Sequence, residues 1–316
     1  MRNAFSRALV TAAQNDPRIL LITGDHGYTL FDEFRRVCPE QYINAGIAEQ
    51  NMVGVAAGLA KGGFRPIVYA LSAFVPMRVL EQIKLDICYE QLPVILIGDG
   101  AGVVYSNLGS SHQSTEDIAA LRAIPNITIL SPADRYEMTA SMELALRSPQ
   151  PVYLRIGKSD LPIIHSAQPH FQFGELCPIK QGNNQICFIA TGSMASTAIK
   201  VSEKISEKAG KKFNNIAVWS APSIKPLNIE QVMAIAQSHE LIVTLEEHSI
   251  YGGLGSAIAE ITAEYAPTRV YRIGIQDRFS KFCGSYQYLM QEHKLDVESV
   301  TSQIFQALKT KLVPRC

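Results

Sequence analysis

Short, nearly continuous apolar segments recur along this chain, and each is separated from the next by a stretch with helical periodicity. In the first half the apolar segments are 18–24, 65–71, 92–98, 126–130 and 151–157, and the helical stretches lie near 3–15, 48–62, 76–90, 115–123 and 134–147. Strands that are apolar at nearly every position are typical of parallel sheets buried on both faces. The alternation therefore predicts an α/β fold with a doubly wound parallel sheet.

The rhythm stops over residues 158–184, which are rich in Pro, His, Gln and Asn and are interpreted as a surface linker. It then resumes with strands predicted at 185–192, 215–221, 240–248 and 269–274 and helices up to 209, near 228–237, from 254 and near 295–311. We therefore expect two domains, one over residues 1–170 and a smaller α/β domain over residues 171–316.

Composition excludes several classes of function. Apolar residues make up 47% of the chain, and 29 Lys and Arg balance 29 Asp and Glu. A nucleic-acid or membrane-surface protein would carry a basic excess or basic clusters. The six cysteines include no CxxC pair, which disfavours a zinc site or a disulfide framework. The N-terminus does not have the pattern of a signal peptide, so we expect a cytoplasmic protein. We also expect that this chain has no metal ligands of its own.

Two glycine clusters resemble nucleotide-binding loops only superficially. The segment "GGLGSA" (252–257) lacks the full GxGxxG spacing and is better explained as a turn before a helix. The segment "GDGAG" (98–102) follows a strand but lacks the lysine of a P-loop. We interpret it as a strand-to-loop turn.

Three residues are candidates for chemistry, and residue type alone leaves each one open. Glu49 precedes an almost uniformly apolar helix, so its carboxylate is either a helix N-terminal group or a buried functional acid. His112 lies in a Ser- and Gly-rich loop after a strand, where it is either solvated or functional. Phe74 follows another strand, and its ring belongs either to the core or to a stacking site for a flat ligand.

The segments that carry these residues resemble the transketolase family of thiamine diphosphate enzymes. The matching stretches are "NAGIAEQNMVGVAAGLA", "SAF" followed by "RVLEQI", "SSHQSTEDIAALRAIPNITILSPAD", "PVYLRIGKSD", "LEEHSIYGGLGSAIAE" and "GIQDRF". The resemblance implies a pyrimidine-binding domain followed by a transketolase C-terminal domain. The family's diphosphate-binding domain, with its magnesium motif, is not represented. The chain therefore resembles the C-terminal subunit of a split transketolase.

The resemblance implies a role for each candidate. Glu49 matches the glutamate that hydrogen-bonds a ring nitrogen of the aminopyrimidine, Phe74 matches the aromatic that stacks on that ring, and Asp25 matches an acid beside the cofactor. His112 matches the histidine that polarises the ketose and stabilises the developing alkoxide. Lys158 aligns with an arginine that binds substrate phosphate, and it retains the charge without the two-pronged geometry.

The remaining substrate positions are mixed. Thr29 aligns with a serine that also holds substrate phosphate, whereas Arg155 is better explained as a strand-end ion-pair residue than as a ligand. Leu108 replaces an aspartate that contacts sugar hydroxyls, and Gly100 replaces a second histidine. Loss of both polar groups predicts a changed sugar preference.

The resulting expectation is a thiamine diphosphate- and Mg²⁺-dependent enzyme that transfers a two-carbon ketol unit from a ketose to an aldose. Its partner would be an N-terminal subunit that carries the diphosphate and magnesium site, in an α2β2 assembly. The alternatives are the β subunit of a 2-oxo acid dehydrogenase and a deoxyxylulose-phosphate synthase-like enzyme. Alone, the chain should be inactive and should carry an unpaired Glu49 in an open half-site.

Overall fold

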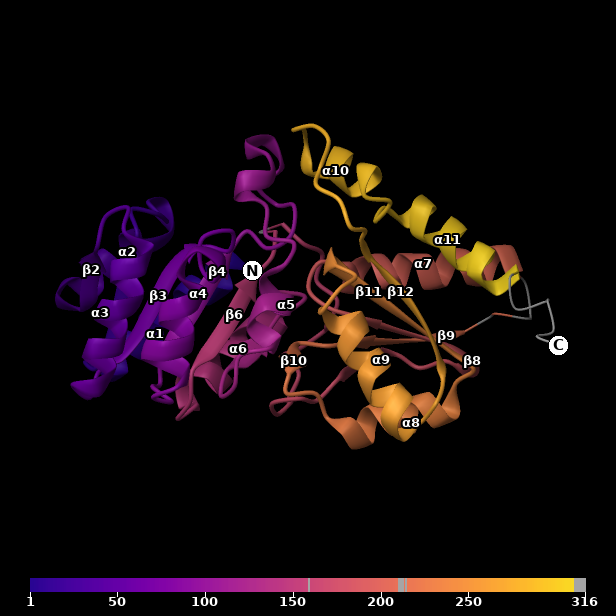
Figure 1. The fold of residues 1–316 in the computed structure, drawn as a ribbon, viewed down its shortest axis with the longest axis horizontal. Helices are drawn as coiled ribbons and strands as arrows, with labels where there is room; N and C mark the ends of the chain where they lie inside the picture. Colours follow the sequence, from indigo (N-terminus) through magenta and orange to yellow (C-terminus); the bar gives the residue numbers. More distant parts are fainter. Residues whose placement is uncertain (159, 210–212, 214, 310–316) are drawn as a thin grey trace.

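The computed structural model describes residues 1–158, 160–209, 213 and 215–309, and it contains two α/β units, each built around its own sheet (Figure 1). The first sheet has seven strands in the order β10-β5-β6-β4-β3-β1-β2, and the second has five in the order β12-β11-β8-β9-β7. The strands are β1 (Ile19–Thr23), β2 (Tyr42–Asn44), β3 (Arg65–Leu71), β4 (Ile95–Asp99), β5 (Thr128–Leu130), β6 (Val152–Ile156), β7 (Cys177–Lys180), β8 (Asn183–Ala190), β9 (Ile216–Ser220), β10 (Ser223–Lys225), β11 (Leu241–Ser249) and β12 (Arg269–Ile275).

Helices cover these sheets. The α-helices of the described chain are α1 (Arg2–Asn15), α2 (Asp32–Val37), α3 (Glu49–Lys61), α4 (Leu80–Gln82), α5 (Asp117–Arg122), α6 (Arg135–Arg147), α7 (Met194–Ala209), α8 (Ile229–Ser238), α9 (Leu254–Tyr265), α10 (Tyr286–Glu292) and α11 (Val297–Lys309). Short 3-10 segments are η1 (Thr29–Phe31), η2 (Pro39–Gln41), η3 (Met77–Val79), η5 (Ser106–Leu108) and η6 (Ser110–His112), and η4 (Ile83–Cys88) is a π-helix.

The predicted parallel sheet is confirmed. Strands β1, β4 and β6 are buried at every position, and β3 is buried at all but its two ends. One apolar cluster contains residues of α1 and α6, and another contains residues of α3, η4 and α5. Because helices lie against both faces, these strands have no solvent-facing side, which explains their continuous apolar sequences.

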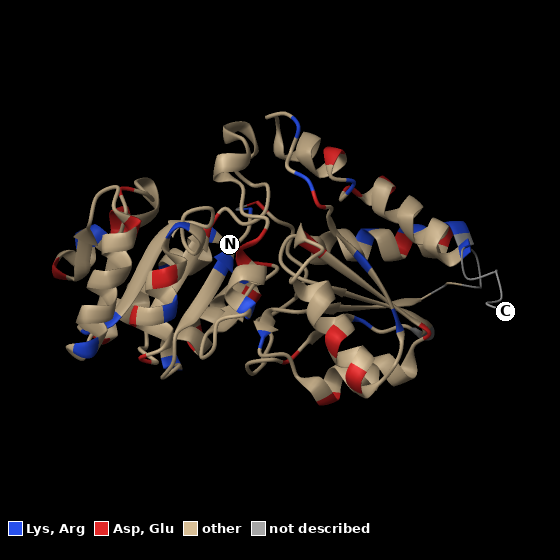
Figure 2. Cartoon of the chain, in the orientation of Figure 1, with Lys and Arg blue, Asp and Glu red and all other residues tan. Residues whose placement is uncertain are grey.

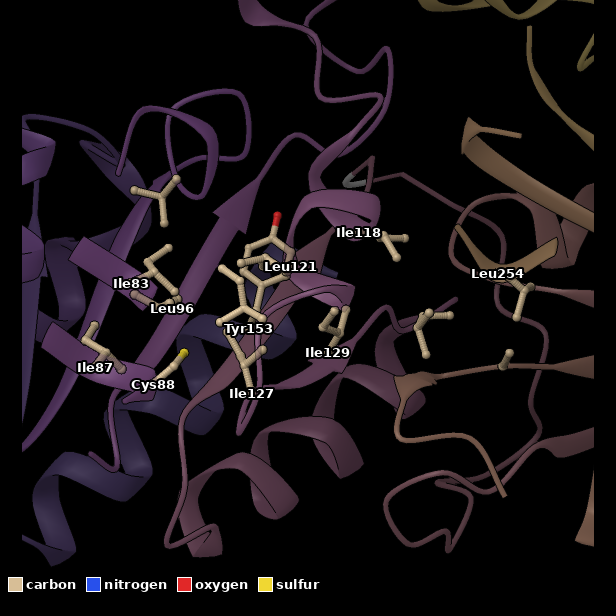
Figure 3. Close-up of a cluster of buried hydrophobic side chains, with 14 of the residues drawn as sticks. Ile83, Ile87, Cys88, Leu96, Ile118, Leu121, Ile127, Ile129, Tyr153 and Leu254 are labelled. Atoms are coloured by element: carbon tan, nitrogen blue, oxygen red, sulfur yellow. The ribbon is translucent and has the colours of Figure 1, made fainter. Parts of the chain in front are cut away.

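The two units share an apolar core. The cluster that includes Ile83 and Leu96 continues through Leu121 and Ile129 to Leu254 at the start of α9 (Figure 3). In addition, β10 follows β9 in the chain but pairs antiparallel with β5 of the first sheet. The second unit therefore supplies both a strand and apolar side chains to the first.

Three local expectations were wrong. The predicted linker 158–184 contains β7 and the start of β8, because β7 is a short edge strand in which the exposed Pro178 interrupts the apolar pattern. The predicted helix 76–90 is divided into η3, α4 and η4. Finally, α2, β2, β10 and α10 were not predicted, since segments of three to seven residues give little periodic signal.

Charge and polarity match the composition. Lys, Arg, Asp and Glu are interspersed over both units (Figure 2). No helix in the described part of the chain is long and apolar enough to cross a membrane. Five described cysteines are free thiols, and four of them are buried.

Candidate functional site

Four neighbouring strands of the first sheet bring the candidate residues to one edge. β4, β3, β1 and β2 are adjacent and parallel, so their carboxyl ends lie together. His26 follows β1, Glu49 follows β2, Phe74 follows β3, and His112 lies in the loop after β4. Residues far apart in the sequence thus meet at the sheet edge where such folds place their ligands.

Glu49 is the first residue of α3 and is 3% exposed. The helix N-terminus favours its negative charge, which confirms the helix-terminal interpretation without excluding the functional one. The expectation of an unpaired carboxylate was wrong, because Arg78 Nη1 donates a hydrogen bond of 3.0 Å to Glu49 Oε2. Glu49 Oε1 is buried and has no hydrogen-bond partner within the described structure.

Phe74 and His112 lie beside this carboxylate region and contact each other. Their ring centroids are 5.3 Å apart with an interplanar angle of 65°. The Arg78 guanidinium carbon lies 4.0 Å from the centroid of the Phe74 ring, in a cation–π arrangement. Ser111 Oγ lies 3.0 Å from His112 Nδ1, so this neighbour orients the imidazole. Arg78 thus links Glu49 to Phe74, and the Phe74 ring in turn contacts His112.

His26 and Arg78 were missed by sequence reasoning. His26 Nε2 is buried without a hydrogen-bond partner and lies 3.9 Å from Glu49 Oε1, and the ring of His26 lies 6.3 Å from that of Phe74. The available signals were weak: a lone histidine beside Asp25, and an arginine four residues after Phe74. Neither spacing indicates a site until the strands place both residues beside Glu49.

Sequence comparison assigns the two units. The chain matches the family "Transketolase, pyrimidine binding domain" over residues 1–163 and "Transketolase, C-terminal domain" over residues 176–300. The chain belongs to the transketolase family.

Relatives of this transketolase chain include split enzymes. It is 31% identical to one of the subunits of an apulose-4-phosphate transketolase from Actinobacillus succinogenes, over 95% of this chain and 96% of the relative. A solved split-gene transketolase, described as an inactive β4 tetramer, has a TM-score of 0.87 and 32% identity, covering 98% of this chain and 97% of that one. The chain is thus a C-terminal subunit of the split transketolase type, and the family is thiamine diphosphate-dependent.

A longer relative is the 1-deoxy-D-xylulose-5-phosphate synthase of Oleidesulfovibrio alaskensis, which is 36% identical over 87% of this chain. The match covers 43% of that relative's length. The likeness thus accounts for less than half of the synthase.

The other predicted transketolase residues have separate surroundings. Asp25 has a positive φ of 59° and accepts a 3.3 Å hydrogen bond from Asn44. Thr29 is exposed on η1 and lines a hollow of about 340 Å³. Lys158 follows β6, pairs with Asp160 and lies 5.4 Å above the ring of Tyr286. These contacts neither join the three residues to Glu49 nor give them a role, so their assignments stay predictions.

The loop after β4 explains how a glycine is accommodated at position 100. A Cβ atom there would lie 2.0 Å from Tyr105 Cε2, so the tyrosine ring fills the space where a side chain would begin. Tyr105 donates a 2.8 Å hydrogen bond to Asp99 Oδ2, and Arg2 Nη2 lies 3.5 Å from the same oxygen. Leu108 is 48% exposed. The loop therefore contains a Tyr–Asp pair and an exposed leucine, and the predicted change in sugar preference stays a prediction.

Arg155 is confirmed as an ion-pair residue. Its Nε donates a 2.8 Å hydrogen bond to Asp117 Oδ2, and its Nη2 donates to the carbonyls of Ser114 and Glu247 at 3.0 Å. Burial alone would raise the pKa of Asp117, but the charges of Arg155 and His248 and the hydrogen bonds to Asp117 outweigh burial and lower it. Through its bond to the Glu247 carbonyl in β11, Arg155 joins the two units.

Gly252 and Gly253 form a turn before α9, as predicted. Both oxygens of the buried Glu246 carboxylate accept 2.8 Å hydrogen bonds, one from the Leu254 and one from the Gly255 backbone N–H at the start of α9. Burial raises the pKa of Glu246 to about 7. A protein carboxylate therefore occupies the helix N-terminus where a nucleotide phosphate would bind.

Proposed function

We propose that this chain provides the pyrimidine half of the active centre in a two-subunit transketolase. The reaction is the transfer of a two-carbon ketol unit from a ketose to an aldose. The observation that carries the proposal is the buried Glu49 carboxylate, whose Oε1 has no hydrogen-bond partner among the described residues, beside Phe74 and His112. A buried acceptor without a hydrogen bond is costly, so a ligand that donates to it recovers free energy.

The residues present fit an aminopyrimidine ring. Glu49 Oε1 and His26 Nε2 are both buried, have no hydrogen-bond partner in the described part of the chain and lie 3.9 Å apart, so a ring with polar edge atoms has two protein groups to bond. We assign Glu49 to a ring nitrogen, Phe74 to the ring face, and Asp25 to the cofactor's surroundings. When bound, thiamine diphosphate supplies the nucleophilic carbon for ketol transfer.

His112 is assigned to the sugar. An imidazole N–H beside the cofactor donates a hydrogen bond to the ketose oxygen on which negative charge develops, which lowers the barrier electrostatically. The contact between the His112 and Phe74 rings supports this placement, because it holds the imidazole next to the proposed cofactor ring.

Lys158 and Thr29 are assigned to an anionic substrate group. The positive charge of Lys158 supports this role, although in this structure it is directed to Asp160 and Tyr286. A relative named for a phosphorylated sugar, apulose 4-phosphate, supports a sugar phosphate as the substrate class.

The partner is proposed to hold the diphosphate and Mg²⁺. In the described part of this chain, no group of three or more His, Cys, Asp or Glu residues could hold a metal ion. A tetramer of β subunits alone, described as inactive in a related split enzyme, supports the need for a second kind of subunit. We propose an α2β2 assembly.

The test is to substitute Glu49 in the complex with its partner. Glu49→Ala should abolish ketol transfer, because the cofactor loses its ring-nitrogen partner. Glu90→Gln, at an exposed carboxylate that pairs with Lys61, is the matched control and should retain activity. Normal ketol transfer by Glu49→Ala would refute the assignment.

The synthase relative provides the second candidate, a deoxyxylulose-phosphate synthase-like carboligase, because its identity to this chain is 36%. Such an enzyme releases CO₂ from an oxo acid, whereas ketol transfer releases an aldose. Release of ¹⁴CO₂ from labelled pyruvate by the complex would favour the synthase.

A further inference from the structure

Arg78 contacts both of the groups that bind the cofactor ring in the proposed function. We propose that Arg78 takes the place of the aminopyrimidine in the cofactor-free chain and that cofactor binding displaces it. This inference rests on the proposed function and adds to it a residue that controls access to Glu49.

The two contacts of Arg78 match those expected of a flat heterocycle. Its Nη1 donates a 3.0 Å hydrogen bond to Glu49 Oε2, and its guanidinium carbon lies 4.0 Å from the centroid of the Phe74 ring. A guanidinium is planar, carries N–H donors in its plane and stacks on aromatic faces. One side chain thus makes a hydrogen bond to the Glu49 carboxylate, at its other oxygen, and the contact with the Phe74 ring face that we assign to the aminopyrimidine.

The carboxylate is closed off in this arrangement. Glu49 Oε1 and His26 Nε2 each have less than 1 Å² of exposed surface, and neither has a hydrogen-bond partner within the described residues. A ligand cannot reach an atom with no exposed surface unless a covering group moves. The two unbonded atoms show that the closed arrangement leaves polar groups unsatisfied, which the cofactor would satisfy.

Arg78 is the group best able to move. Its side chain is 46% exposed, whereas the Glu49 side chain is 3% and that of His26 is 22% exposed. It lies on the single turn η3, and a long unbranched stem can carry its charge into water. Glu49, in contrast, is fixed at the start of α3, whose apolar face packs in the core.

Displacement has a thermodynamic signature. If the contacts of Arg78 exist only before the cofactor binds, their removal raises the free energy of the empty state and leaves the bound state unchanged. Arg78→Met should therefore destabilise the empty chain and tighten cofactor binding. If Arg78 instead stayed beside Glu49 in the bound state, the same substitution would leave affinity unchanged or weaken it.

The experiment compares wild type, Arg78→Met and a control in two measurements. The first is the Tm of the chain alone, and the second is the Kd of thiamine diphosphate with Mg²⁺ by isothermal titration calorimetry, on the chain complexed with its diphosphate-binding partner. Arg18→Met is the control, because Arg18 pairs with Asp16 at the amino end of β1, away from the site edge, and its side chain is 69% exposed.

We expect Arg78→Met to lower the Tm by about 2–8 °C and to tighten the Kd roughly 5- to 30-fold, the effect of about 1–2 kcal/mol. Arg18→Met should change neither value appreciably. Unchanged or weaker binding by Arg78→Met, with normal binding by wild type, overturns this inference alone. No binding by wild type and both variants overturns the proposed function and the inference together.

Two further variants test the proposal if Arg78→Met does not fold. Arg78→Lys keeps the charge but loses the planar group, so it should tighten cofactor binding to a smaller degree. Adding Glu49→Gln to Arg78→Met removes the unpaired carboxylate and should restore most of the lost Tm. Failure of both variants to behave in this way would contradict the displacement.

Discussion

Replacing Arg155 with Met should destabilise the whole protein, because this arginine is a buried link between the two units. Arg155 is 3% exposed, and its guanidinium donates to the Asp117 carboxylate and to the Ser114 carbonyl in the first unit. It also donates to the Glu247 carbonyl in β11 of the second unit. Methionine keeps much of the stem and removes every one of these donors.

The magnitude follows from what remains after the substitution. Asp117 is 0% exposed, and its Oδ1 already lacks a hydrogen-bond partner within the described structure. Without Arg155, its remaining close contacts are the hydroxyl of Tyr153 at 2.7 Å and His248 at 3.9 Å. Removing one partner of a buried ion pair costs about 3–5 kcal/mol. We therefore expect a loss of roughly 4 kcal/mol, a large part of the 5–15 kcal/mol typical of folded proteins.

Urea unfolding provides the assay. Far-UV circular dichroism follows both units, and the fluorescence of Trp219, the only tryptophan, follows β9 of the second unit. With a slope of about 2 kcal/mol per molar urea, the midpoint should fall by about 2 M. Both signals should shift, since Arg155 joins the two units.

A loss below about 1 kcal/mol would refute the reasoning, because it would mean that Asp117 finds a partner or water without Arg155. Arg18→Met serves as control here too, since solvent screens an exposed pair and leaves it little effect on stability. Combining Asp117→Asn with Arg155→Met removes the stranded charge and should recover part of the loss.

Two further substitutions test the surroundings of the site. The pKa of Glu246 is raised by burial to about 7, so the stability that this group contributes is lost as pH rises from about 4.5 through 7. Glu246→Gln does not titrate, so urea unfolding should show its stability relative to wild type rising by about 3 kcal/mol between pH 4.5 and 8. His248, whose pKa burial lowers to about 4, is present in both proteins, so its contribution cancels in the difference. A difference in stability between Glu246→Gln and wild type that does not change with pH would contradict the raised pKa of Glu246. Gly100→His should lower the Tm, because its Cβ would lie 2.0 Å from Tyr105 Cε2, and adding Tyr105→Ala should recover part of the loss. An equal Tm for Gly100→His and wild type would show that the Tyr105 ring moves aside.

Periodicity predicted the long elements and failed on the short ones. β1, β3, β4 and β6 are apolar at nearly every position because both faces of their sheet are covered, so they stand out in the sequence. β2 and β10 have three residues each and give no pattern. β10 lies in the first sheet only because the chain returns from the second unit, which no local signal indicates.

The site was predictable only where a family motif covered it. Glu49, Phe74 and His112 were candidates by their place in the sequence and received roles only through the family resemblance, and the structure brings Phe74 and His112 into ring contact. His26 and Arg78 belong to no pattern that residue type or spacing makes visible, yet their side chains lie against Glu49 and Phe74.

The sequence was sufficient to predict the fold class, the two α/β units and the family, because apolar periodicity and motif spacing are properties of consecutive residues. It was not sufficient to predict the partner of Glu49. That partner, Arg78, lies 29 residues away, and only the pairing of β1 with β2 and β3 brings the loops that follow these strands together. A buried carboxylate requires compensation, and tertiary structure decides which group provides it.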